Sequence, residues 1–479
     1  MTRDIIPEED IFFDVHCHTM NLSHPCLFAF LKRFLKVPHN PVLTSVKGAT
    51  LGSITGLLAP FLGKPFLNKY LNHLSIMERD VARIHMAMED DLPKSLKVGS
   101  KEFKRVSVSP LLMDFWADET AKGIHYQFTP KSIIPQVLDV LNGIADYANI
   151  VRGDHYEECI KQFQHVKDEG RQIGLDKQWH LDLRKLDSTK ANEPLQHFGP
   201  NKRRIISFPF MGLNTEYCFL DGVKRQSHES TNLNTLLEKY FGNNEAGPFT
   251  GTFSGLSSKF GQFTGNLDDA RGDYFAGIKV YPPLGFDPWP EGNDHELKKV
   301  EHLYDFCERR KVPITSHCSD GGFKVGEPKI AAARSHPKKW AEVLKHYRKL
   351  KLNIAHFGGE NSGLRYKESW WSKPFLKLFH GGDPEWVMTI ITLLKSYENV
   401  YTDMSYSGVS DKYYKVFGKI VNDHGEIKDK LLFGSDFTIN LLSIDSYQHY
   451  LKKFTDTETL DEALKLKMCN TNPRKFLFQ

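Results

Sequence analysis

Two histidines, two positions apart, close the first apolar segment of the chain. Residues 13–18 read Phe-Asp-Val-His-Cys-His. Because side chains alternate between the faces of a strand, Asp14, His16 and His18 are expected on one face. Two imidazoles on one face can bind a shared metal ion. With 21 histidines in 479 residues, chance supplies about one such pair, so its meaning depends on the rest of the chain.

Other apolar segments of the second half also end in residues that can bind a metal. They are Lys279 in 275–281, His317 at the end of 312–317, His356 at the end of 352–356, and Asp436 after 431–435. Neutral imidazoles and a carboxylate suit Zn²⁺ or a similar divalent ion that keeps one position open for water. Such an ion lowers the pKa of bound water towards about 7 and polarises a carbonyl. Asp436 is the candidate that takes the water's proton and passes it to the leaving group.

Apolar segments alternate with amphipathic helices, which predicts a parallel sheet. The predicted strands are 11–15, 105–112, 204–210, 275–281, 312–317, 352–356, 400–404 and 431–435. Helices are predicted over 294–310, after a Ser335 N-cap with Pro337, after Asp383 and Pro384, around 414–421, and over 460–468. Eight strands predict a (β/α)8 TIM barrel, in which all carboxyl ends of the strands meet at one mouth. Residues 1–479 are expected to form one barrel domain, with large, mainly helical insertions after strands 1, 2 and 3 (about 19–104, 114–203 and 212–273) covering that mouth.

Composition excludes some partners and leaves others open. The 63 Lys and Arg nearly balance 59 Asp and Glu, so no nucleic-acid partner is expected. Seven cysteines without a Cys-x-x-Cys pair, and an acidic N-terminus unlike a signal peptide, favour the cytoplasm. Residues 15–77 contain no acidic residue, and their uncharged run 48–63 is too short for a spanning helix. Contact with a membrane or protein through residues 24–72 stays open, as does oligomerisation.

Six motifs, in order along the chain, resemble one family. They are Asp-Val-His-Cys-His (14–18), Gly-Ile-Lys-Val-Tyr-Pro-Pro (277–283), Ile-Thr-Ser-His-Cys (314–318), Ile-Ala-His-Phe-Gly-Gly (354–359), Leu-Phe-Gly-Ser-Asp-Phe (432–437) and Asn-Thr-Asn-Pro-Arg-Lys-Phe-Leu-Phe (470–478). Together they resemble the amidohydrolase superfamily, in particular its amidohydrolase-related (amidohydrolase 2) branch of metal-dependent TIM-barrel hydrolases. The three long insertions have no match in this resemblance.

The resemblance implies a role for each strand-end residue. His16, His18 and Asp436 would bind a first metal, and His317 and His356 would bind a second metal or contact substrate. Lys279 stands where binuclear members carry a carboxylated lysine between two metals. An ordinary ammonium at Lys279 that pairs with a carboxylate or an anionic substrate is the alternative, so one and two metals per chain both stay open.

Residues next to these ligands are expected to support them rather than to react. Asp403 and Tyr406 follow the seventh strand, Tyr281 follows Lys279, and Glu360 follows the turn after His356. Asp14, on the strand of His16, is expected to orient an imidazole.

Three functions are consistent with this ligand set. The leading hypothesis is a metal-dependent hydrolase in which metal-bound hydroxide attacks an amide, ester or lactone carbonyl of a small molecule, with Asp436 and His356 as catalytic residues. The first alternative is a metal-dependent decarboxylase of an aromatic or unsaturated carboxylic acid. The second is a metal-containing binding or scaffold protein that acts through its inserted segments.

Overall fold

The computed structural model describes the parts of the chain that build the strands and most of the helices beside them. These are residues 8–21, 24, 73, 76–77, 79–115, 133–149, 204–220, 222–242, 263–270, 274–319, 321–322, 328–366 and 383–479. Much of the three expected insertions, and all of residues 24–72 except His24, lie outside the described residues. Within the described part, no helix is long and apolar enough to cross a membrane.

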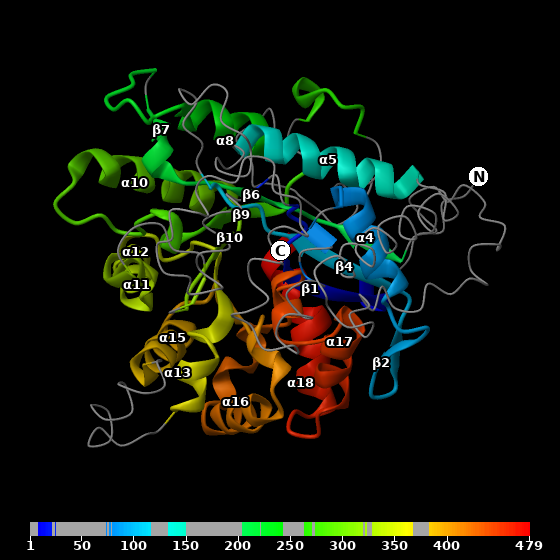
Figure 1. Ribbon diagram of the computed structural model, residues 1–479. Helices are drawn as coiled ribbons and strands as arrows, with labels where there is room; N and C mark the ends of the chain where they lie inside the picture. The colour runs from blue at the N-terminus through cyan, green and yellow to red at the C-terminus, as the bar shows by residue number, and fades with distance from the viewer. Residues whose placement is uncertain are drawn as a thin grey trace, which may run out of the picture.

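Two parallel sheets form the centre of the molecule (Figure 1). The first contains β1 (Ile11–Cys17), β4 (Arg105–Pro110) and β5 (Ile205–Ser207), in that order. The second contains β6 (Phe210–Gly212), β9 (Gly277–Val280), β10 (Ile314–Ser316), β11 (Leu352–Ile354), β12 (Val400–Asp403) and β13 (Leu431–Leu432), also in chain order. The predicted α/β class with parallel strands is therefore confirmed.

Backbone contacts connect the two sheets at two places. On one side Val15 N donates to Phe433 O at 3.0 Å, and a parallel bridge joins Cys17 to Phe437. On the other side a parallel bridge joins Leu111 to Phe210. The predicted third strand is divided into β5 and β6 around Pro209, whose nitrogen has no hydrogen to donate to a ladder.

Helices cover the outside of the sheets (Figure 1). Their bounds are α4 (Val81–Asp90), α5 (Ile133–Asn149), α8 (Leu233–Phe241), α10 (Asp294–Arg310), α11 (Pro328–Ser335), α12 (Pro337–His346), α13 (Glu360–Leu364), α15 (Pro384–Ser396), α16 (Asp411–Asp423), α17 (Tyr447–Asp456), α18 (Glu462–Leu466) and α19 (Asn472–Phe478). Two short pairs, β2 (Leu96–Val98) with β3 (Lys101–Phe103) and β7 (Cys218–Phe219) with β8 (Thr231–Asn232), lie outside the main sheets.

The helix starts test the capping predictions. Asp383 is the N-cap of α15 and Pro384 its first residue, as predicted. The predicted Ser335 cap of α12 is wrong. Ser335 ends α11 and its hydroxyl donates to Ala331 O, so His336 caps α12 through its imidazole. The last predicted helix extends further, because a π-helical turn (Lys467–Thr471) joins α18 to α19.

A register shift in β1 overturns the expected alternation of side chains. The pairing of β1 with β4 is regular for residues 11–14 and shifts before the end of the strand. Val15 packs in a small cluster with residues of both sheets and α19, whereas Phe12 belongs to the larger core. Asp14 accepts a hydrogen bond from Tyr447 of α17 at 3.0 Å. Asp14 and His16 therefore do not share a face, because an extra residue in a bulge reverses the alternation after it.

A substitution at Gly434 can test whether β1 packs closely against the segment after β13. A Cβ at Gly434 would lie 2.7 Å from the Cβ of His16 and 3.1 Å from that of Ser405. Gly434→Ala is expected to lower the free energy of unfolding by about 1–3 kcal/mol, because the packed backbone must shift. Gly425→Ala is the matched control, since nothing lies within 4 Å of its Cβ position. Equal urea midpoints for both variants would contradict this packing.

Candidate metal centre

The structure brings His16, His18 and Asp436 together at the carboxyl ends of β1 and β13. One ligand atom from each lies within 4.8 Å of the other two, and all three residues are buried. The Oδ1 atom of Asp436 lies 3.2 Å from His18 Nε2 and 3.5 Å from His16 Nε2. The three predicted ligands of a first metal thus converge.

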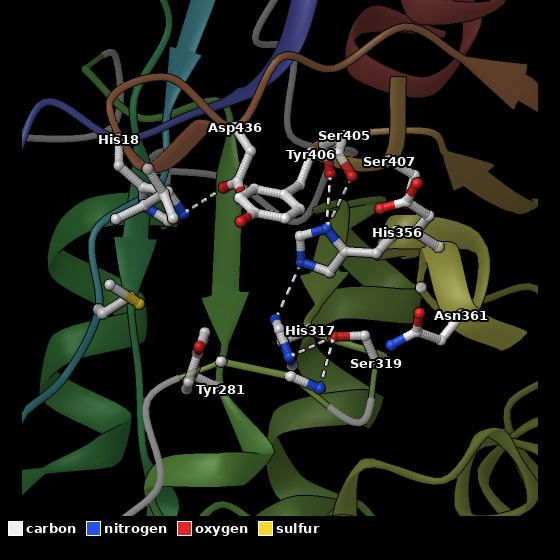
Figure 2. A pocket seen from close by; sticks show the side chains of 16 residues that line it. His18, Tyr281, His317, Ser319, His356, Asn361, Ser405, Tyr406, Ser407 and Asp436 are labelled. Carbon is white, nitrogen blue, oxygen red and sulfur yellow. Dashed lines mark hydrogen bonds and ion pairs between the residues drawn. The ribbon is translucent and has the colours of Figure 1, made fainter. Parts of the chain in front are cut away.

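His356 and His317 lie beside this triad. The Nε2 atom of His356 is 2.9 Å from Nδ1 of His317, and the rings of His356 and His16 are 4.7 Å apart. Figure 2 shows His18 joined to Asp436, and His356 joined to His317, around one pocket. All four predicted histidines therefore form one continuous group.

Lys279, on β9, is buried near the same carboxylates. Its Nζ has no hydrogen-bond partner among the described residues and lies 5.7 Å from the ring centre of Tyr281. Burial lowers the pKa of Lys279 to about 8, although the charges of Asp403 and Asp436 act to raise it. About a tenth of the amine is then neutral at pH 7, and only the neutral amine can be carboxylated.

Asp403, at the end of β12, is the carboxylate that holds the His16 imidazole and the backbone of His356. Its Oδ2 accepts from His16 Nδ1 at 3.0 Å and from Asn353 Nδ2 at 2.7 Å. Its Oδ1 accepts from the backbone nitrogens of His356 and Ser405, both at 3.0 Å. The hydrogen bond between Asp403 and His16 Nδ1 is thus consistent with the supporting role expected for Asp403.

Asp14 does not orient an imidazole, contrary to the prediction. Its carboxylate accepts from Tyr447 and from two backbone nitrogens, Ser435 N at 2.9 Å and His16 N at 3.2 Å. The register shift in β1 separates Asp14 from the His16 ring. The hydrogen bonds of Asp14 to His16 N and Ser435 N join the backbone of β1 to the segment after β13, and burial raises the pKa of Asp14 to about 7.

Ser405 determines which nitrogen of two imidazoles carries the proton. Its hydroxyl donates to Asp403 Oδ1 at 2.5 Å, so its single proton is already used. Its Oγ also lies 3.0 Å from His16 Nδ1 and 2.9 Å from His356 Nδ1, and both nitrogens must therefore be N–H donors. His18 Nδ1 donates to Leu111 O at 2.9 Å. In all three residues Nε2 is left as a lone pair.

This arrangement fits a bound cation. The lone pairs of His16 and His18 face the carboxylate of Asp436, and His16 Nε2 has no hydrogen-bond partner among the described residues. Two lone pairs and a negative charge repel one another in a buried site unless a positive ion lies among them. Nδ1 hydrogen-bonded and Nε2 free is the arrangement that metal-binding histidines adopt.

The electrostatics agree with neutral imidazoles and ionised carboxylates. Burial lowers the pKa of His16 to about 3 and also lowers the pKa of His317 and His356. Burial alone would raise the pKa of Asp436, but its close contact with His18 and the charges of the nearby imidazoles outweigh it and lower that pKa. Neutral imidazoles with a carboxylate are the donor set that Zn²⁺ and similar ions prefer.

Three residues at the centre hold backbone conformations that residues other than glycine rarely adopt. The φ angles are 66° at His356, 62° at Tyr406 and 60° at Asp436. Such conformations persist only where the surroundings enforce them, and they gather at functional sites. Each strained residue follows the end of a strand, where the chain turns towards the pocket.

The pocket beside the ligands has a volume of about 250 Å³. Its lining includes the candidate ligands His18, His317, His356 and Asp436. The other lining residues are Met113, Tyr281, Ser319, Gly321, Gly322, Gly359, Glu360, Asn361, Ser405, Tyr406, Ser407 and Ile439. A small molecule in this cavity would touch the candidate metal centre directly.

The sequence did not single out His73 or Ser405. His73 is buried, its Nδ1 lies 2.8 Å from Thr438 O, and the charges of Asp436 and His18 act on its pKa, which burial lowers to about 4. No motif surrounds His73 that could have indicated this place. Ser405 had one signal, its position two residues after Asp403 at a strand end.

Another group of possible ligands lies elsewhere, at Glu229, His295 and Glu296. There Lys299 Nζ donates to Glu229 Oε1 at 3.0 Å and to Cys218 O at 2.9 Å. The lysine ammonium already supplies the positive charge, so this group is an ion-pair network.

Comparison with known proteins connects the second half of the chain to one family. Residues 265–479 match the family model described as amidohydrolase. The matched segment contains Lys279, His317, His356, Asp403 and Asp436, whereas His16 and His18 lie before it. No curated protein matches the chain.

Two solved structures are similar at low level. One is a probable 2-pyrone-4,6-dicarboxylic acid hydrolase from Acinetobacter baumannii with citric acid bound, at 16% identity over 48% of this chain and 70% of that chain, with a TM-score of 0.29. The other is an amidohydrolase from Burkholderia multivorans with bound HEPES, at 12% identity over 44% of this chain and 68% of that chain, with a TM-score of 0.29. The similarity to the amidohydrolase family therefore rests on residues 265–479.

Proposed function

We propose that this enzyme is a metal-dependent hydrolase that cleaves an amide, ester or lactone bond of a small molecule. The observation that carries the proposal is the set of unprotonated Nε2 atoms of His16 and His18 facing the Asp436 carboxylate beside a cavity. A buried arrangement of this kind needs a cation, and the cavity leaves room for a substrate next to it.

The fold in this proposal is one (β/α)8 barrel formed by residues 1–479. The bridges between Cys17 and Phe437, and between Leu111 and Phe210, support closure because they connect the two sheets at two separate places. If β5 and β6 count as one interrupted strand, eight strands surround the small apolar cluster. The covering of the mouth by inserted segments belongs to the same proposal.

His16, His18 and Asp436 would hold the first metal, with Zn²⁺ as the proposed ion. His317, His356 and Lys279 would hold a second one, with Lys279 carboxylated. A divalent ion at this place would acidify a water molecule and polarise a substrate carbonyl. Whether the enzyme holds one ion or two distinguishes the two interpretations of Lys279.

Asp436 and His356 are the proposed catalytic residues. Asp436 is ionised and lines the cavity, so its carboxylate can accept the proton of the attacking water and return it to the leaving group. His356 also lines the cavity, and its Nδ1–H is held by Ser405, so its Nε2 is directed towards the centre as an acceptor. Burial of both groups keeps bulk water from competing for these contacts.

The cytoplasm is the proposed location. Cys17, Cys218, Cys307, Cys318 and Cys469 are free and buried, so the described cysteines form no disulfide framework.

Metal analysis together with a substrate panel tests the hydrolase proposal. Protein loaded with Zn²⁺ or Mn²⁺ is expected to hydrolyse at least one member of a panel of esters, lactones and amides, and elemental analysis should find one or two ions per chain. Asp436→Asn is expected to lose at least about 100-fold in kcat and to bind metal more weakly, because both the proton acceptor and a ligand change.

Three outcomes would contradict the proposal. No hydrolysis of any panel member, with Asp436→Asn leaving the metal content unchanged, would refute it directly. Release of carbon dioxide from aromatic or unsaturated acids, with one ion per chain, would favour the decarboxylase. Tight binding to liposomes by an inactive protein would favour the scaffold.

Ser405→Ala tests the proton positions on the imidazoles. Loss of the hydroxyl removes one acceptor of His16 Nδ1–H and one of His356 Nδ1–H, so metal affinity is expected to fall about 10–100-fold. Competition with a chromophoric chelator measures that affinity without any substrate.

Ser407→Ala is the matched control, since Ser407 lines the same cavity and, among the described residues, its hydroxyl makes no hydrogen bond to an imidazole. Its metal affinity should stay within about twofold of the wild type. Equal affinities for Ser405→Ala and the wild type would show that the hydroxyl does not hold the tautomers.

A further inference from the structure

Ser319 is a buried residue of the pocket, and its hydroxyl contacts the ring of His317. Its Oγ lies 3.1 Å from His317 Nε2 and accepts a hydrogen bond from the backbone nitrogen of Gly321 at 3.2 Å. Ser319 and His317 both line the cavity, and Figure 2 shows the contact between them. No other side chain among the described residues hydrogen-bonds His317 Nε2.

The His317 ring is held in one orientation. The Tyr281 ring lies against it, with ring centroids 4.6 Å apart and 38° between the planes. A Cβ at Gly322 would lie 2.8 Å from His317 Nε2, so the backbone of Gly322 closes that end of the ring. The opposite nitrogen, Nδ1, consequently faces His356 Nε2 at 2.9 Å.

The hydrogen bonds leave one consistent arrangement of protons on the two neutral imidazoles. His356 Nδ1 lies 3.2 Å from Ser405 O, and a carbonyl oxygen can only accept. The proton of His356 is therefore on Nδ1, and its Nε2 is a lone pair. His317 Nδ1 then donates to this lone pair, and the Ser319 hydroxyl donates to His317 Nε2.

An ion bound by both histidines requires the opposite arrangement on His317. Each nitrogen that binds an ion must present a lone pair, so the proton of His317 has to be on Nε2 instead of Nδ1, and the imidazole stays neutral. In this buried place the Nε2–H group then needs an acceptor. Ser319 Oγ is at hydrogen-bond distance and has two acceptor lone pairs, of which Gly321 N uses one.

We propose that Ser319 is a positioning residue for His317: its hydroxyl donates to Nε2 in the ion-free centre and accepts from Nε2–H when Nδ1 binds the second ion. This inference rests on the second ion of the proposed function and is independent of which bond the enzyme cleaves. Because one oxygen serves both proton positions, His317 can change from a hydrogen-bond donor to a ligand without turning its ring.

Titration of metal-free, full-length protein with Zn²⁺ measures this role without any substrate. In buffer that contains bicarbonate, calorimetry of the wild type is expected to show two binding events, and His317→Ala identifies the second event by losing it. Ser319→Ala should weaken the second event about 10–100-fold and leave the first within about twofold. Ser319→Thr keeps the hydroxyl and should restore the wild-type affinity.

Ser316→Ala separates ion binding from stability. The buried Ser316 hydroxyl accepts from Trp340 Nε1 at 3.0 Å and donates to the His317 backbone carbonyl at 3.3 Å, and it bonds no imidazole among the described residues. This variant is expected to lower the melting temperature, because Trp340 loses its acceptor. Both of its ion affinities should stay within about twofold of the wild type.

Three results would overturn the inference. Equal second affinities in the wild type and Ser319→Ala would show that the Gly321 backbone, which also acts on the ring, is sufficient. An equally weakened second event in Ser319→Thr or Ser316→Ala would assign Ser319 a packing role. A single event in the wild type would remove the second ion from the proposed function, and the inference with it.

The proposed reaction can fail separately from this inference. Two binding events, with the second weakened only in Ser319→Ala, would support the role of Ser319 even if the protein hydrolysed no ester, lactone or amide.

Discussion

The hydrogen bonds that the buried Asp403 carboxylate accepts hold the rest of the centre in position. A buried charge is tolerated only when donors satisfy it, and here the donors come from different parts of the fold. Asn353 lies on β11, His356 on the turn after it, and His16 on β1 of the other sheet. The same carboxylate thus joins the two sheets and fixes the ring of a candidate ligand.

Ser405 connects Asp403 to two of the imidazoles. The Ser405 hydroxyl donates its proton to Asp403 and accepts hydrogen bonds from both His16 and His356. Because each imidazole carries one exchangeable proton when neutral, fixing it on Nδ1 leaves Nε2 for the centre. Burial keeps the rings neutral by penalising the imidazolium form, so proton position and charge state have the same structural origin.

The candidate functional side chains lie at or just after the ends of strands, and the turns that follow the strands orient them towards the pocket. His356, Tyr406 and Asp436 each hold a left-handed backbone after a strand, and each lines the cavity. The packed sheets beneath them offset the cost of these conformations. Gly434 is also required by the packing around the site, since only a residue without Cβ allows the segment before Asp436 to lie against His16.

Local patterns predicted much of this arrangement. Apolar runs located every strand of the two main sheets, although most strands are shorter than predicted. The third strand was predicted as continuous and is interrupted at Pro209, and the cap of α12 moved by one residue because Ser335 bonds within the preceding helix. His16, His18, Lys279, His317, His356 and Asp436 were predicted to lie together because the ends of parallel strands share one edge.

The sequence by itself determined which residue types stand at the strand ends and so what chemistry the chain can perform. Only the tertiary structure decided which groups support them. His16 and Asp403 are 387 positions apart, and no local pattern relates them. The alternation of side chains predicted that Asp14 would contact the His16 imidazole. Because of the register shift in β1, Asp14 instead contacts Tyr447 of α17, and Asp403 contacts the His16 imidazole. The sequence gives the identity of each residue directly. The partner of a buried polar group depends instead on how strands distant in sequence align, and that alignment is set only when the chain folds.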